Sequence, residues 1–231
     1  MNDRLDPTMA QFQTMRETAA RYYDEKIRVF GAVARGVDWN SEESQHLRFH
    51  QLLRLIDEPD LGTVNDYGCG YGAFASFLRG RGFGGRYAGF DISATMIAEA
   101  IAAHADDPLS SFTNDREALA GADYTFASGV FNVKQDHSPS HWQDYILATL
   151  TDMDGLSGRG FAFNMLSSYS DRARQRSDLF YAEPGFYFDY CKTQFAKQVA
   201  LLHDYVPAWS PRLPNFLKNG TRLLHCACAL L

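Results

Sequence analysis

The sequence predicts an α/β fold of three layers, in which helices cover both faces of a mostly parallel sheet. Two observations predict it. Short apolar runs alternate along the chain with segments whose apolar residues recur at helical spacing. The first of these runs leads directly into a glycine-rich turn. A helical extension precedes this pattern, and an antiparallel strand is expected to end it.

Length and composition favour one such domain with added segments. The chain has 231 residues, 45% of them hydrophobic, and a net charge of −6 that argues against a large nucleic-acid surface. No stretch approaches the roughly 20 apolar residues that cross a bilayer, and the polar start of the chain lacks the apolar core of a signal peptide. We therefore expect a cytoplasmic protein that acts on a small molecule, with no membrane or nucleic-acid partner and an oligomeric state that remains open.

The cysteines do not predict a disulfide framework or a metal site. The chain has four cysteines, too few and too scattered for a disulfide framework in a chain of this length: Cys69, Cys191, Cys226 and Cys228. Cys226 and Cys228 would share one face of a strand, but no second pair of ligands accompanies them, so no metal is expected.

Residues 1–60 are expected to form a helical lid segment in front of a main domain at 61–231. Residues 9–29 contain few helix breakers, and Asn40 with Glu43 resembles a capping box that opens a second helix. The apolar residues of that helix follow the spacing of one buried face: Phe49, Leu52, Leu53 and Ile56.

The main domain alternates strands and helices. Strands are expected at residues 63–67, 87–90, 124–127 and 161–166, with a short one at 111–113 and a late one at 198–205. Each helix between them shows an apolar face: Phe74, Phe77 and Leu78; Met96, Ile97 and Ile101; Trp142, Tyr145, Ile146, Leu150 and Met153. Prolines at 207, 211 and 214 exclude a central strand there, so the last strand must come from residues 223–231.

The glycine turn runs from the first strand into the first of these helices. Gly68, Gly70 and Gly72 allow positive φ angles and a close approach of a ligand to the backbone. Their GxGxG spacing differs from the GxGxxG of dinucleotide-binding turns, which disfavours a nicotinamide cofactor. Asp66, two residues ahead, would repel a pyrophosphate but accept hydrogen bonds from an ammonium group.

Asp91 ends the second predicted strand, 23 residues after Gly68. At that place a carboxylate can accept hydrogen bonds from both hydroxyls of a ribose. Together with Asp66 it predicts an adenosine-like ligand with a positively charged far end.

The segments DYGCGYG and GFDIS resemble those of the class I, Rossmann-like S-adenosylmethionine-dependent methyltransferases, and the resemblance covers residues 64–166. The segments ASGVFN and WNSEESQHLRF resemble a bacterial small-molecule subgroup. The resemblance implies S-adenosylmethionine as the cofactor, with the turn on its methionine part and Asp91 on its ribose. It also implies that Ile92 and Met96 pack near the adenine and that Asn114, Asp115 and Arg116 contact its edge. The loop at Ser128 and Gly129 would lie between cofactor and substrate. The full set of cofactor-binding residues expected is Asp66, Tyr67, Gly68, Cys69, Gly70, Gly72, Asp91, Ile92, Met96, Asn114, Asp115, Arg116, Ser128, Gly129 and Arg48.

Several of these residues have simpler interpretations. The turn could be a tight connection alone, and Ile92 and Met96 could be core residues. The lid segment contains aromatic and hydrogen-bonding residues that similar enzymes fold over the cofactor: Tyr22, Tyr23, Trp39, Gln45 and Arg48. Arg48 could bind the cofactor carboxylate, or it could be a solvated helix residue and the aromatics plain packing. The aromatic residues around 180–190 could wall a substrate pocket or pack on the sheet.

A general base is the least defined part of the site. His137 or Asp136 could remove a proton from a hydroxyl acceptor. Pro139 lies between His137 and His141, so a two-histidine metal site on a regular helix is not expected.

The sequence thus predicts methyl transfer from S-adenosylmethionine to an oxygen or nitrogen of a small-molecule acceptor. The alternative is a protein of the same fold that binds this cofactor without catalysis.

Overall fold

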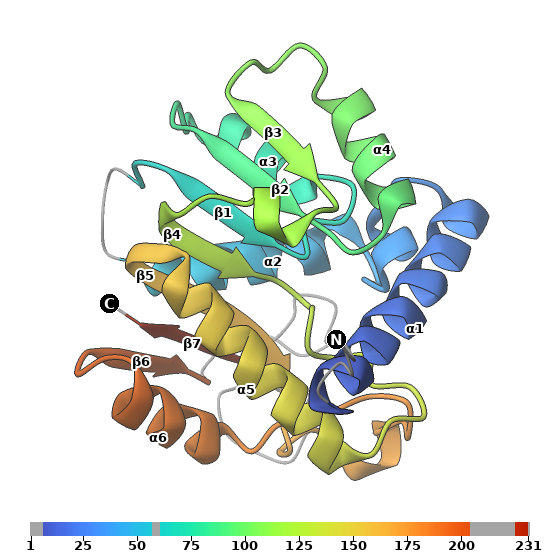
Figure 1. Ribbon diagram of the computed structural model, residues 1–231, viewed down its shortest axis with the longest axis vertical. Helices are drawn as coiled ribbons and strands as arrows, with labels where there is room; N and C mark the ends of the chain where they lie inside the picture. Colours follow the sequence, from blue (N-terminus) through green and yellow to red (C-terminus); the bar gives the residue numbers. More distant parts are fainter. Residues whose placement is uncertain (1–6, 57–60, 204–224, 231) are drawn as a thin grey trace, which may run out of the picture.

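The protein is built on one seven-stranded sheet (Figure 1). The computed structural model describes residues 7–56, 61–203 and 225–230, the last only as backbone. The strand order is β3-β2-β1-β4-β5-β7-β6. The strands are β1 Val64–Tyr67, β2 Tyr87–Phe90, β3 Ser110–Thr113, β4 Ala122–Ala127, β5 Ser157–Leu166, β6 Val199–Leu202 and β7 His225–Leu230.

Six α-helices and three short 3-10 helices accompany the sheet in the described part of the chain. The α-helices are α1 Pro7–Phe30, α2 Glu42–Arg54, α3 Ala73–Gly80, α4 Ala94–Ala103, α5 Pro139–Gly155 and α6 Pro184–Gln194. The 3-10 helices are η1 Ala34–Val37, η2 Arg116–Ala118 and η3 Arg172–Arg174. None of the described helices is long and apolar enough to span a membrane.

The order of the parallel strands indicates where a ligand site is expected. β3, β2, β1, β4 and β5 all pair in parallel. Chain order reverses direction at β1, since the chain moves outward from β1 to β2 and β3 and then returns to β4 on the other side of β1. In such sheets, ligands bind beyond the carboxyl ends of the strands at this switch point.

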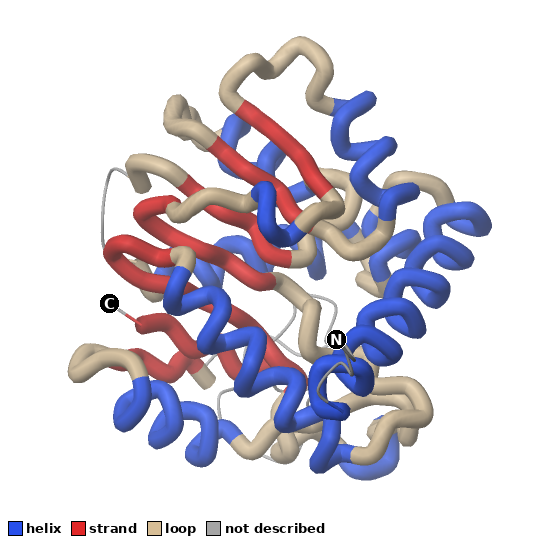
Figure 2. The backbone as a smooth tube through the Cα atoms, viewed as in Figure 1, coloured by secondary structure: helices blue, strands red, loops and turns tan. Residues whose placement is uncertain are grey.

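Helices lie on both faces of the sheet (Figure 2), as the three-layer prediction requires. Buried apolar residues form two clusters, one on each face. In Figure 1, α5 and α6 cover the near face of the sheet, while α2 and α3 lie behind it. Successive side chains of β5 point to opposite faces of the sheet and so contribute to both clusters. Phe161 and Phe163 lie on the α5 side, and Ala162 lies on the α2 and α3 side. The fold class expected from the sequence is confirmed.

The predicted last strand forms, and it lies inside the sheet. β7 pairs antiparallel with β5 on one side and β6 on the other, with Phe163 opposite Cys228. The proline segment before it lies outside the described residues. An interior strand has its backbone groups paired on both sides, so β7 does not offer the open sheet edge that favours self-association.

Two local predictions were wrong. The cap of α2 is Ser41, whose hydroxyl accepts from the Ser44 amide, so the expected capping box at Asn40 lies one residue early. Ile101 is 52% exposed, and Ala100 takes its place on the buried face of α4. A capping side chain reaches the free amides of the first turn only from the N-cap position. Asn40 and Ser41 are both suitable caps, so residue type alone does not show which of them occupies that position.

The N-terminal segment crosses the open end of the sheet. Helix α1 packs against η1 and α4 and runs beside the carboxyl ends of the strands in Figure 1. Ser93, the N-cap of α4, donates a hydrogen bond to Asp24 of α1 and so ties the two helices together. The expected boundary between lid segment and main domain at residue 60 falls in 57–60, outside the described residues.

Candidate functional site

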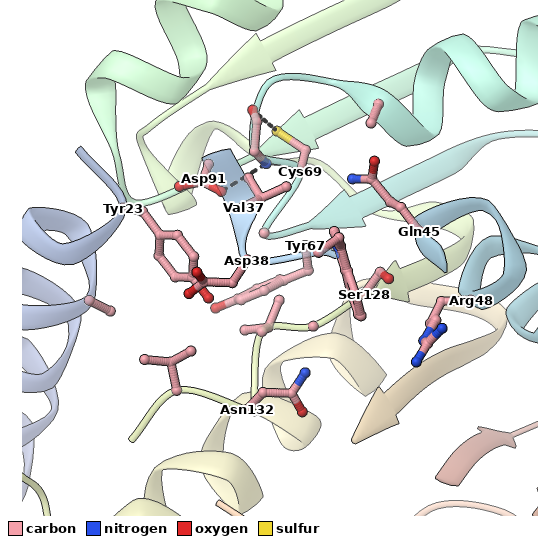
Figure 3. A pocket seen from close by; sticks show the side chains of 18 of the residues that line it. Tyr23, Val37, Asp38, Gln45, Arg48, Tyr67, Cys69, Asp91, Ser128 and Asn132 are labelled. Carbon is pink, nitrogen blue, oxygen red and sulfur yellow. Dashed lines mark hydrogen bonds between the residues drawn. The ribbon is translucent and has the colours of Figure 1, made fainter. Parts of the chain in front are cut away.

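A cavity of about 280 Å³ opens at the carboxyl ends of β1, β2 and β4 (Figure 3). The glycine turn and the ends of these strands form one side of it, and the N-terminal segment forms the other. The cofactor-binding residues expected from the sequence that line it are Arg48, Asp66, Tyr67, Gly68, Cys69, Gly70, Asp91, Ile92, Met96, Ser128 and Gly129. The structure therefore brings together most of the predicted site.

The glycine turn needs glycine at its first position. Gly68 has a φ of +83°, and a Cβ placed there would lie 2.3 Å from a methyl group of Val130. Gly68 and Cys69 both donate backbone hydrogen bonds to the carbonyl of Phe90, which fixes the turn against the end of β2. The turn is thus held open to the cavity by backbone conformation, and side chains would disrupt it.

Gly72 lies at the start of α3, outside the cavity wall. It is the left-handed N-cap of α3 and does not line the cavity, while its carbonyl accepts from the ring of His104. A Cβ at this position would lie 2.9 Å from that ring. The third glycine shapes the start of α3, so any effect on a ligand is indirect.

Asp66 is a buried acid at the bottom of the turn. Its side chain is 2% exposed and accepts a hydrogen bond from the hydroxyl of Tyr87. Its pKa is raised to about 7, because removal from water disfavours the charged form; the hydrogen bond from Tyr87 acts against this rise and the Asp91 carboxylate adds to it. A cation in the cavity would stabilise the carboxylate.

Asp91 is fixed by the backbone on both sides. One carboxylate oxygen accepts from the Gly70 amide and the other from the Ser93 amide, both at 2.9 Å. Burial raises its pKa to about 6 even though these two hydrogen bonds act to lower it. Each oxygen keeps a second lone pair, so the carboxylate can still accept from two neighbouring hydroxyls.

The N-terminal segment adds a third acid, Asp38, at the cavity wall (Figure 3). Asp38 has a φ of +63°, accepts from the Tyr22 hydroxyl and forms an ion pair with Lys26 at 2.7 Å. Tyr23, on the same helix, lines the cavity, and burial raises its pKa far above the usual value. This side of the cavity therefore combines one acid, Asp38, with the neutral phenol of Tyr23.

Arg48, on α2 of the same N-terminal segment, lies across the cavity from Tyr23 and is 2% exposed, which excludes the solvated interpretation (Figure 3). Its guanidinium donates to the carbonyl and hydroxyl of Ser44 and lies over the ring of Trp39, 5.2 Å from the centroid. Arg48 is thus a buried cation in a cavity whose acids lie at the turn and in the N-terminal segment.

The loop after β4 closes the cavity between these two sides. Asn164 of β5 is fully buried, accepts from the Gly129 amide at 2.8 Å and donates to the Ser128 hydroxyl at 3.1 Å. Asn132 also lines the cavity, and its side chain accepts from the Leu166 amide. Two buried amides therefore fix the loop to β5.

Comparison with known proteins identifies the family. The methyltransferase domain family matches residues 40–172, which include the turn, Asp91 and the loop after β4. The chain belongs to this methyltransferase family. A Mycobacterium tuberculosis protein named as a methyltransferase is 42% identical over 153 residues, which is 66% of this chain and 92% of that protein.

Solved structures share the fold of this methyltransferase. Magnesium protoporphyrin IX methyltransferase from Synechocystis with bound S-adenosylmethionine has a TM-score of 0.57 at 13% identity, over 100% of both chains. The N-methyltransferase NodS from Bradyrhizobium japonicum with S-adenosylhomocysteine has a TM-score of 0.60 at 12% identity, over 91% of this chain and 96% of that one. The sequence-based predictions of family, fold and enzyme class are confirmed.

Three residues expected to contact adenine lie elsewhere in the methyltransferase. Asn114, Asp115 and Arg116 follow β3 but do not line the cavity. The Asp115 side chain caps η2, and the Arg116 guanidinium forms an ion pair with Asp152 of α5. Asp115 and Arg116 thus have structural contacts of their own. The contact of all three residues with adenine stays a prediction.

The general base expected from the sequence also lies outside the cavity. Asp136 is exposed, and the ring of His137 stacks on Trp142 at 6.3 Å. His137 precedes α5, which begins at Pro139, so it does not share a helix with His141. Within the described ranges no cluster of side chains could hold a metal ion. A catalytic role for His137 or Asp136 stays a prediction without support from the geometry.

Sequence reasoning missed Asp38 and Asn132 in the cavity wall. Both are brought to the site by tertiary contacts between segments far apart in the chain. The aromatic residues after β5 mainly pack, since Phe180 and Tyr187 are buried in the core on the α5 side and Tyr181 alone among the predicted group lines the cavity. A signal for Asp38 existed in its neighbours Trp39 and Arg48, which the lid prediction included.

Proposed function

We propose that this methyltransferase moves a methyl group from S-adenosylmethionine to an oxygen or nitrogen of a small-molecule acceptor. The observation that carries the proposal is the juxtaposition, in one cavity, of an open glycine turn, Asp66 and Asp91. Solved structures with this fold hold S-adenosylmethionine or S-adenosylhomocysteine, and one of them is an N-methyltransferase.

The residues present fit this cofactor. Asp91 keeps two acceptor positions for the ribose hydroxyls, and Asp66 faces the cavity as an acceptor for the ammonium group. Met96, which is 1% exposed, and Ile92 offer apolar surface to the adenine. Arg48 is the buried cation that could pair with the cofactor carboxylate.

When bound, the cofactor supplies a methyl group on a positively charged sulfur. The protein's own contribution is to orient the acceptor and exclude water, which can lower a barrier by roughly 7–11 kcal/mol. Trp39, the loop at Ser128 and Gly129, and Tyr181 wall the space beside the turn. The described residues that line the cavity include carboxylates but no histidine, so a general base for a hydroxyl acceptor would be one of these acids, whereas a neutral amine needs no base.

Calorimetric titration tests the cofactor assignment. We expect S-adenosylmethionine and S-adenosylhomocysteine to bind and a nicotinamide dinucleotide not to bind. Asp91→Ala should weaken both cofactor forms, because it removes the ribose acceptor, whereas Asp136→Ala, on an exposed residue outside the cavity, should leave affinity unchanged. Failure of folded protein to bind either form would overturn the proposal.

Turnover tests the acceptor class. Release of S-adenosylhomocysteine is measured with panels of small amines, phenols and carboxylic acids. We expect activity within the amine or hydroxyl panels, and tight cofactor binding without turnover on any panel would instead indicate a binding protein of the same fold. A comparison of wild type with His137→Gln on the active acceptor decides whether His137 acts as a base.

A further inference from the structure

Tyr87 reaches the acid of the glycine turn from the neighbouring strand. In the parallel pairing of β1 and β2, Asp66 stands opposite Gly89, and Tyr87 lies two residues earlier on the same face of the sheet. Gly89 has no side chain, and the space where its Cβ would stand is occupied by Cys69 and Phe112. Tyr87 is left to provide the polar contact, and its hydroxyl donates to one oxygen of Asp66.

Both partners are shielded from water. Asp66 and Tyr87 are each 2% exposed, so solvent cannot easily replace the hydrogen bond if it is lost. A hydrogen bond to an ionised group is stronger than one between neutral groups, and an unpaired buried acceptor is costly. The contact is therefore suited to control the charge and the orientation of Asp66.

The groups that face Asp66 shift its pKa in opposite directions. Burial and the Asp91 carboxylate at the end of β2 raise its pKa, while the hydrogen bond from Tyr87 lowers it. The Cys69 thiol of the turn is kept neutral, because burial raises its pKa well above the usual value. With these contributions the pKa of Asp66 is about 7, so its charge depends on small effects near neutral pH.

We propose that Tyr87 is a positioning residue that keeps Asp66 ionised and aimed into the cavity, and thereby sets the affinity for the cofactor's ammonium group. The proposal rests on the proposed function, because it assigns that ammonium group to Asp66. Tyr87 is not among the residues that line the cavity, so it acts through Asp66. Only the ionised form of Asp66 attracts a cation, so cofactor binding weakens as pH falls through its pKa.

The test is calorimetric titration of the full chain with S-adenosylhomocysteine between pH 5.5 and 8.5. This probe keeps the ammonium group and has no methyl to transfer. In Tyr87→Phe the loss of the hydrogen bond should move the pH midpoint of binding upward by about one unit. If only the ionised form binds, Kd at pH 7 should then rise about fivefold, because the competent fraction falls from about one half to about one tenth.

Three further variants separate this role from a general effect on folding. Tyr187→Phe removes another buried hydroxyl, on α6 and away from the cavity, and should leave the pH midpoint unchanged. Asp66→Asn should remove the titration step assigned to Asp66. Tyr87→Phe in the Asp66→Asn background should have no additional effect on Kd, since the group through which Tyr87 acts is then neutral.

The outcomes distinguish the two proposals. Absence of binding by the wild type overturns the cofactor assignment itself. Normal binding with the same pH midpoint in wild type and Tyr87→Phe overturns the role of Tyr87 alone. A loss of affinity for Tyr87→Phe that persists in the Asp66→Asn background has the same meaning, because the effect then does not pass through Asp66.

Discussion

Trp39 lies directly against the backbone of Gly129, so close that a Cβ at residue 129 would be 2.9 Å from its ring. This contact joins the N-terminal segment to the loop after β4. The same indole ring carries the guanidinium of Arg48 on its face. A continuous line of contacts therefore runs from α2 through Trp39 and Gly129 to Asn164 in the sheet.

We predict that Gly129→Ala destabilises the protein and weakens cofactor binding. Gly129 has a φ of +82°, which costs an alanine about 1–3 kcal/mol before the contact with Trp39 is counted. Urea unfolding and titration with S-adenosylhomocysteine measure the two effects. Gly185→Ala is the matched control, because nothing lies within 4 Å of its Cβ position in α6, and it should be neutral or slightly stabilising.

We predict that Asn164→Ala lowers the free energy of unfolding by about 1–3 kcal/mol, because it leaves the Gly129 amide and the Ser128 hydroxyl without their shared partner. Ser128→Ala removes only one of these hydrogen bonds and should cost less. Hydrogen exchange of the Gly129 amide should accelerate in Asn164→Ala but not in Ser128→Ala. Equal exchange in both variants would show that Asn164 does not hold the loop.

We predict that Asp66→Asn stabilises the ligand-free protein at pH 8 and has little effect near pH 4. The folded-state pKa of about 7 lies above the ordinary value of 3.8, so the folded state binds the proton more tightly. The free energy of unfolding of the wild type therefore falls as pH rises from about 4 to 7. The neutral amide escapes this loss, which we expect to be roughly 2–4 kcal/mol by urea unfolding.

Asp123→Asn provides a control of opposite sign. Hydrogen bonds from the amide and hydroxyl of Thr63 lower the pKa of Asp123. Its carboxylate therefore contributes stability that is present at neutral pH and lost as pH falls through that lowered value. Asp123→Asn should destabilise at pH 8, and a stabilising effect there would contradict the assignment of charge at both sites.

We predict that Arg116→Ala lowers the thermal unfolding midpoint but changes the Kd of S-adenosylhomocysteine by less than about twofold. Arg116 pairs with Asp152 and lies outside the residues that line the cavity, so its contribution is to join η2 to α5. Asp152→Ala should also lower the midpoint, but it removes in addition the acceptor of the Tyr67 hydroxyl, whose residue lines the cavity. A large loss of affinity in Arg116→Ala alone would restore the adenine contact implied by the family resemblance.

The sequence by itself determined the fold class and the chemistry of the cofactor side. Period-two and period-3.6 patterns mark the strands and helices, and the spacing of Asp66, the glycines and Asp91 is local enough to read along the chain. These residues lie at the ends of β1 and β2, which are neighbours in the sheet, so the distance between them follows from parallel pairing.

The tertiary structure alone decided the charge state and the surroundings of that site. The burial of Arg48, the place of Asp38 and the contact of Tyr87 with Asp66 depend on how separate elements pack, and nothing in a linear pattern fixes those distances. His137 and Arg116 carry suitable side chains, but packing turns them toward Trp142 and Asp152. Residue type states what a group can do, and only packing determines what it faces.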